Sequence, residues 1–181
     1  MNARSAPALL VAAGLAIFAG GNAGAQTAAD LFSGFQARSN EPVQVNAELL
    51  EVYEEGTQRI SVFSGNVVVV RGDTTLKAAT IRLYSDLGGE LSAVSAFTRI
   101  EADGGVFVGS KDQTVTGQAA VVNMDTRTIT VSGGVVLSQG NNVLTGNRLV
   151  VDLATGRARV EGAGGPVRGV FTPSSPPTVG Q

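Results

Sequence analysis

The segment Phe63-Ser64-Gly65-Asn66-Val67-Val68-Val69-Val70-Arg71-Gly72 recurs without gaps as Val131-Ser132-Gly133-Gly134-Val135-Val136-Leu137-Ser138-Gln139-Gly140. In both copies a glycine precedes a run of aliphatic, mostly β-branched residues, and a second glycine ends the segment. β-Branched residues favour strands, whereas glycine marks turns and bulges. Each copy therefore predicts a strand that starts near its first glycine and ends in a turn.

A third copy lies between these two, and the strand that returns after each turn is repeated as well. The matched positions, at offsets of 39 and 68 residues, are Gly65 with Gly104 and Gly133; Val67 with Val106 and Val135; Val69 with Val108 and Leu137; Leu76 with Val115 and Leu144; Ala78 with Gly117 and Gly146; Ile81 with Ala120 and Leu149; and Leu83 with Val122 and Val151. The copies are thus spaced by 39 and then 29 residues (68 − 39 = 29). That spacing does not fit the single fixed period of a simple β-solenoid.

The returning strand contains an irregular step. Ala78 and Ile81 are three residues apart, whereas side chains on one face of a regular strand are two apart. One inserted residue, a bulge near Ala79 and Thr80, would put both side chains on the same face and increase the twist. Because all three copies share this step, the sequence predicts a curved hairpin that is repeated along the chain.

One face of the predicted strands is more consistently apolar than the other. We expect that face to enclose an interior, and the opposite face, with Ser138, Arg148 and Asp152, to meet water. The inward positions contain no obvious polar anchor. The side chains expected to face the interior are Val67, Val69, Leu76, Ile81, Leu83, Val106, Val108, Val115, Val122, Val131, Val135, Leu137, Leu144, Leu149 and Val151.

The first 25 residues have the order of a secretory signal peptide. Arg4 precedes the apolar run 9–19, and Ala23-Gly24-Ala25 provides a small-residue cleavage site. The run is shorter than the ~20 residues of a membrane-spanning helix. We expect cleavage after Ala25 and a mature protein without a stable membrane span; a retained anchor is the alternative.

The remaining chain divides by composition into three parts. Residues 26–40 lack strict periodicity and predict a flexible leader with one short helical turn at most, around 31–35. Residues 41–171 carry the strand pattern, and apolar runs alternate there with turn clusters about every 10–20 residues, as in hairpin-linked strands. Residues 172–181 are rich in proline, which lacks the backbone donor of a strand ladder, so we expect a disordered tail.

The composition argues against several classes of function. The 13 basic and 15 acidic residues leave no basic surface for nucleic acid, and the chain has no cysteine and no histidine. Thiol nucleophiles, disulfides, the usual zinc sites and the commonest general base are therefore absent. The carboxylate pairs Glu54-Glu55 and Glu101/Asp103 lie in or beside turns, where solvated charge is ordinary. We expect no enzyme activity, no cofactor and no metal site.

The repeated blocks, together with Glu41-Pro42-Val43-Gln44-Val45-Asn46-Ala47 as a first strand, resemble the LptA/OstA-like family of lipopolysaccharide-transport periplasmic proteins. The resemblance covers about residues 41–171. It implies an all-β fold, a twisted antiparallel β-jellyroll that is open at both ends. It also implies a periplasmic protein that shields the acyl chains of lipopolysaccharide in its apolar interior.

The same resemblance implies partners. Members bridge an inner-membrane transporter to an outer-membrane translocon through LptC-like and LptD-like proteins, and copies also stack head to tail. Unpaired edges invite strand addition, and we expect the strands 43–50 and 167–171 to be the edges. Five arginines could reach lipid phosphates at the rim, although we expect most of them to face water: Arg71, Arg82, Arg148, Arg157 and Arg168. The alternative is a structural β-scaffold of the envelope with a filled core and no lipid cargo.

Overall fold

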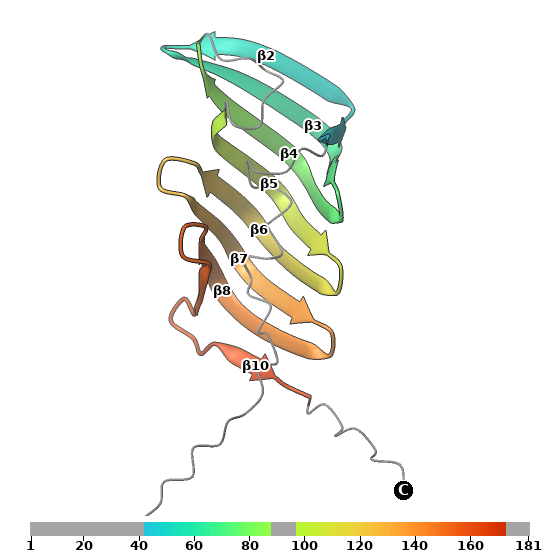
Figure 1. The fold of residues 1–181 in the computed structure, drawn as a ribbon, viewed down its shortest axis with the longest axis vertical. Coiled ribbons are helices and arrows are strands. Elements are labelled where there is room, and N and C mark those ends of the chain that lie inside the picture. Colours follow the sequence, from blue (N-terminus) through green and yellow to red (C-terminus); the bar gives the residue numbers. More distant parts are fainter. Residues whose placement is uncertain (1–41, 88–96, 173–181) are drawn as a thin grey trace, which may run out of the picture.

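The computed structural model describes residues 42–87 and 97–172, and these form strands and turns without a helix. The strands are β1 (Gln44–Asn46), β2 (Leu49–Glu55), β3 (Gln58–Arg71), β4 (Thr74–Asp86), β5 (Phe97–Ser110), β6 (Gln113–Asn123), β7 (Thr128–Gln139), β8 (Asn142–Asp152), β9 (Arg157–Glu161) and β10 (Arg168–Val170). They form one ten-stranded antiparallel sheet that does not close on itself (Figure 1). The prediction of an all-β, antiparallel fold is confirmed. Among the described residues there is no helix with the length and hydropathy of a bilayer-spanning segment.

The predictions for residues 1–25, 26–40 and 173–181 lie outside the described residues.

The described sheet has a simple order. Strands β3 to β8 have 11 to 14 residues each and pair with their sequence neighbours as a meander. Two short strands flank each end of this meander, β1 and β2 on β3, and β9 and β10 on β8.

The single first strand expected over residues 43–50 is wrong. It is divided into β1, which pairs with one half of β3 (Asn46 with Val68), and β2, which pairs with the other half (Leu49 with Ser64). Between them the Glu48 N–H donates to the carbonyls of Ser64 and Gly65, at 3.0 and 3.2 Å. The strand breaks there because β3 itself bends at Gly65, so one straight strand cannot follow both halves.

Each glycine of the repeat opens a β-bulge. Between the pairs Ser64–Thr80 and Val67–Ala78, β3 has two residues where β4 has one. The extra residue therefore lies on the glycine-bearing strand, and its assignment to the returning strand near Ala79 and Thr80 is wrong. The bulged residues have left-handed backbone in all three copies: Gly65 (φ +83°) and Asn66 (+46°), Gly104 (+83°) and Gly105 (+88°), Gly133 (+83°) and Gly134 (+68°).

The bulges fold the sheet into two facing layers. On β5, Ile100 and Val108 are eight residues apart and would be roughly 26 Å apart on a straight strand, yet both line one cavity. We call the strand halves that continue into β1 and β10 the β1 layer, and the halves that continue into β2 and β9 the β2 layer. The β1 layer comprises 67–71, 74–78, 106–110, 113–117, 135–139 and 142–146; the β2 layer comprises 58–64, 80–86, 97–103, 119–123, 128–132 and 148–152.

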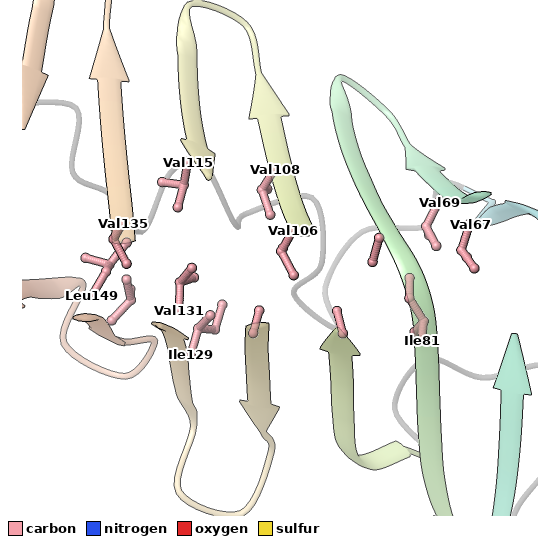
Figure 2. Close-up of a cluster of buried hydrophobic side chains, with 14 residues drawn as sticks. Val67, Val69, Ile81, Val106, Val108, Val115, Ile129, Val131, Val135 and Leu149 are labelled. Carbon is pink, nitrogen blue, oxygen red and sulfur yellow. The ribbon is translucent and has the colours of Figure 1, made fainter. Parts of the chain in front are cut away.

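The hydrophobic core lies between these layers and is rich in valine. Figure 2 shows that its labelled side chains come from several strands and gather in one cluster. Small residues at the bend let the backbones approach: a Cβ on Gly117 would lie 2.6 Å from Cγ1 of Val131, and a Cβ on Gly146 would overlap Val160. The buried core residues are Val67, Val69, Ala78, Ile81, Ala102, Val106, Val108, Val115, Ala120, Ile129, Val131, Val135, Leu149 and Val151.

The two bulge positions should tolerate different substitutions. Gly133→Ala is expected to lower the free energy of unfolding by roughly 1–3 kcal/mol, because Gly133 has φ +83° and an added Cβ would lie 2.6 Å from the Cβ of Gln118. Gly134→Asn should cost only about 0.5 kcal/mol, because that Cβ has open space and Asn66 holds the equivalent position. Urea unfolding followed by circular dichroism measures both; equal losses would contradict the assigned close approach at Gly133.

Candidate functional site

The interior between the two layers is the candidate site. Of the fifteen side chains expected to face it, ten are buried in the core: Val67, Val69, Ile81, Val106, Val108, Val115, Val131, Val135, Leu149 and Val151. Four are partly buried and pack against the core: Leu76, Leu83, Val122 and Leu137. Leu144 is half-buried and lies outside the core cluster. Lipid contact at these positions stays a prediction.

Sequence reasoning missed several interior residues. Ile129 is fully buried two positions before Val131, so strand alternation alone could have placed it on the inner face. Phe63, which the repeat aligns with Val131, packs against the core as well. Met124 lies beyond the end of β6, outside the repeated blocks, and no pattern in the sequence pointed to it.

An apolar cavity of about 40 Å³ remains between the layers. Two of its lining residues come from the β1 layer, Leu76 and Val108, and the others come from the β2 layer or, for Met124, from the turn after it: Ile100, Ala102, Ala120, Val122, Met124 and Ile129. A cavity needs roughly 10–15 Å³ to hold one water molecule. This space is therefore narrow.

A row of polar side chains lies on the inner face of the β1 layer, beside its hairpin turns. On β3, Val67, Val69 and Arg71 alternate onto the same face, and Arg71 pairs with Thr74. The row continues across the sheet through successive pairs in the order Arg71, Thr74, Ser110, Gln113, Gln139 and Asn142. Arg71, Thr74 and Gln113 are 3%, 2% and 5% exposed. The expectation of an inner face without polar anchors is therefore wrong, as is the solvent-facing orientation of Arg71.

The inner face of the β2 layer is mostly apolar toward its turns. Leu83, Ile100 and Val122 are partly buried against the core, and Leu153 packs there just beyond β8. Ser61 and Ser85 are buried polar exceptions, and the Ser85 hydroxyl donates to the Arg59 carbonyl at 3.5 Å. The interior therefore has one apolar lip in the β2 layer and one polar lip in the β1 layer.

The outer face of the β2 layer holds a charged network that does not face the cavity. Arg82 Nη1 donates to Asp103 Oδ2 at 2.9 Å, and Arg99 Nε donates to Glu101 Oε1 at 2.7 Å. The Tyr84 hydroxyl donates to Glu101 Oε2 at 3.0 Å. Burial, followed by this bond to a carboxylate, raises the pKa of Tyr84. These groups hold β4 against β5.

The other predicted rim arginines lie as expected. Arg148, Arg157 and Arg168 are exposed. Asp152 ends β8, where the backbone N–H groups of Thr155 and Ala154 donate to its carboxylate and lower its pKa. The contacts of Asp152 stabilise a turn, and they give no sign of a reactive carboxyl.

Both ends of the sheet expose apolar side chains. At the end with β2, at the top of Figure 1, the exposed residues are Val43, Val45, Leu49, Leu50, Val52 and Tyr53; at the end with β10, at the bottom, they are Val167, Val170 and Phe171. In the described ranges, β1, β2, β9 and β10 each pair on one side only. The charges differ between the ends: β2 carries Glu51, Glu54 and Glu55, whereas β9 and β10 carry Arg157, Arg159 and Arg168 beside Glu161.

Comparison with known proteins places this arrangement in a family. The model of the LptA/(LptD N-terminal domain) LPS transport protein family matches residues 44–157. The chain belongs to this family. The predicted family membership is confirmed, and with it the β-jellyroll architecture.

Two individual proteins are similar to this family member. Uncharacterized protein R00383 of Rhizobium meliloti (strain 1021) is 35% identical over 109 residues, which cover 59% of this chain and 58% of that protein. The chain thus matches little more than half the length of that relative. LptH of Pseudomonas aeruginosa, described as the LptA homologous periplasmic component of the conserved lipopolysaccharide transport device, aligns with a TM-score of 0.59 at 19% identity, covering 76% of this chain and 100% of LptH. At that identity the match supports the fold.

Core and lip positions should differ in their contribution to stability. Leu149→Ala is expected to cost about 2–5 kcal/mol of unfolding free energy, because Leu149 is 0% exposed in the core. Leu144→Ala, on the same strand but outside the core cluster, should cost clearly less. Thermal unfolding of the two variants compares them, and matching losses would argue against this division of the interior.

Proposed function

We propose that this protein is a periplasmic lipopolysaccharide carrier that holds acyl chains between the β1 and β2 layers. The observation that supports it most directly is the apolar cavity, which is lined in part by the partly buried Leu76 and Val122 and lies in a sheet that is not closed. Residues 1–25 would direct the chain to the periplasm.

Energetics favour an empty carrier that is closed. Burying hydrocarbon contributes about 0.8 kcal/mol per methylene, so a chain of about ten methylenes contributes about 8 kcal/mol. Parting the layers exposes the valine core, and the incoming chains cover it again. Without lipid the layers close because exposed apolar surface is unfavourable.

The two ends of the sheet suit contacts with neighbouring proteins. Their exposed apolar side chains and one-sided strands can extend a sheet across an interface. We propose that one end meets an LptC-like protein and the other an LptD-like protein or a second copy. The chain would then form part of a bridge from the inner-membrane transporter to the outer-membrane translocon.

A structural scaffold without cargo is the second candidate. The observation in its favour is the packed core, in which Val67, Val131 and Leu149 are fully buried and the cavity beside them measures about 40 Å³. A scaffold needs no separation of the layers, whereas a carrier does. Two experiments distinguish these functions.

The first experiment maps lipid contact. A photo-reactive amino acid at Leu137 or Val122 is expected to crosslink to lipopolysaccharide, because both side chains lie at the margin of the interior. The adjacent positions Ser138 and Val121 face outward by strand alternation and serve as controls. The readout is the lipid-shifted band on a gel. Crosslinking that was equal at inner and outer positions, or absent from all four, would contradict carriage between the layers.

The second experiment locks the layers together. The chain has no cysteine, so Leu76→Cys with Met124→Cys places one thiol from the β1 layer and one from beside the β2 layer against the same cavity. A cleavable bis-maleimide crosslink between them should abolish lipopolysaccharide binding, and cleavage should restore it. Thr114→Cys with Ser138→Cys joins neighbouring strands within the β1 layer and should leave binding intact. Full binding by the locked protein would favour the scaffold.

A further inference from the structure

The polar row of the β1 layer is a repeated feature with one charged member. At offsets of 39 and 68 residues, Arg71 corresponds to Ser110 and Gln139, and Thr74 corresponds to Gln113 and Asn142. Each copy therefore ends its inward apolar run with a polar pair. Only the first copy places a cation there, and that cation is 3% exposed.

Burying a guanidinium is expensive unless its charge is used or compensated. Arg71 and Gln113 both have interaction partners within the protein. A guanidinium has five N–H donors in a planar fork, so it can serve the protein and an oxyanion at the same time.

The row lies one strand step from the cavity. Leu76 and Val108 line the cavity, and each is two residues from the row, at Thr74 and Ser110. Two residues of strand span roughly 7 Å. An amphiphile whose polar group binds at the row could therefore place its hydrocarbon chain in the apolar cavity.

We propose that Arg71, with Thr74, Ser110 and Gln113, forms a site that recognises a phosphate on the bound lipid and makes the carrier prefer phosphorylated over unphosphorylated amphiphiles with the same acyl chains. This inference rests on the proposed function. Guanidinium–phosphate pairs are charge-assisted and bidentate, and the neighbouring hydroxyl and amide groups add donors for further phosphate oxygens. The apolar lip of the β2 layer takes the chains.

The test compares two probes, a tetra-acylated disaccharide lipid with two phosphates and the same lipid without them. Binding is measured by displacement of a fluorescent fatty acid. The protein should bind the phosphorylated probe roughly tenfold more tightly. Arg71→Gln should remove this preference and leave affinity for the unphosphorylated probe unchanged, whereas Arg71→Lys should keep part of it. Arg168→Gln removes the same charge from exposed β10 and should keep the full preference.

The outcomes separate this inference from the proposed function. Failure of both probes to bind the unmodified protein would overturn carriage itself, whereas equal binding of the two probes would overturn only the phosphate site. Equal affinity for inorganic phosphate alone would also overturn it, since the site would then need no lipid. If Arg71→Gln does not fold, Gln113→Glu provides a second variant: the added anion should weaken only the phosphorylated probe, and an unchanged preference would count against the site.

Discussion

The row of left-handed bulges is the constraint on which the rest of the structure depends. Without the bulges, strands of 11 to 14 residues would form an open sheet whose valine-rich face is exposed to solvent. Two successive residues with positive φ on β3, β5 and β7 bend each of these strands sharply. The hydrogen-bonded ladder resumes on either side of each bulge, so neighbouring strands must bend at the same level. The bend brings Leu76 and Val108 opposite Ile100 and thereby creates both the core and the cavity.

Much of this arrangement could be predicted from the repeat. Alternation placed Val67, Val131 and Leu149 on the inner face, because strand parity determines which side chains share a face. The position of the extra residue could not be predicted. A three-residue step shows that parity changes, but it does not show which of two paired strands carries the insertion. Arg71 shows a second limit: its parity with Val69 indicates the interior, whereas arginine generally prefers the surface, and the sequence alone does not decide between these two rules.

A protein with a closed interior can still carry lipid, because an apolar side chain is stabilised by burial against other side chains and against acyl chains alike. The side chains that pack against one another in the empty protein are those that acyl chains would cover. Separation of the two layers would then exchange contacts between side chains for contacts with lipid. The core would be exposed to water only until lipid binds. Valine dominates the core. Its short, stiff side chain loses little conformational entropy on burial.

The two lips of the interior follow from how the turns differ. In the β1 layer, tight hairpins at 72–73, 111–112 and 140–141 directly adjoin the inward polar pairs, of which Arg71, Thr74 and Gln113 are buried. In the β2 layer, apolar residues continue beyond the strand ends to Met124 and Leu153. An amphiphile between the layers therefore meets unlike surfaces on its two sides, and its polar part is favoured beside the β1 layer. Because Arg71 is the one cation of the row, the interior is also unsymmetrical along the sheet, with its positive charge near β3 and neutral amides near β8.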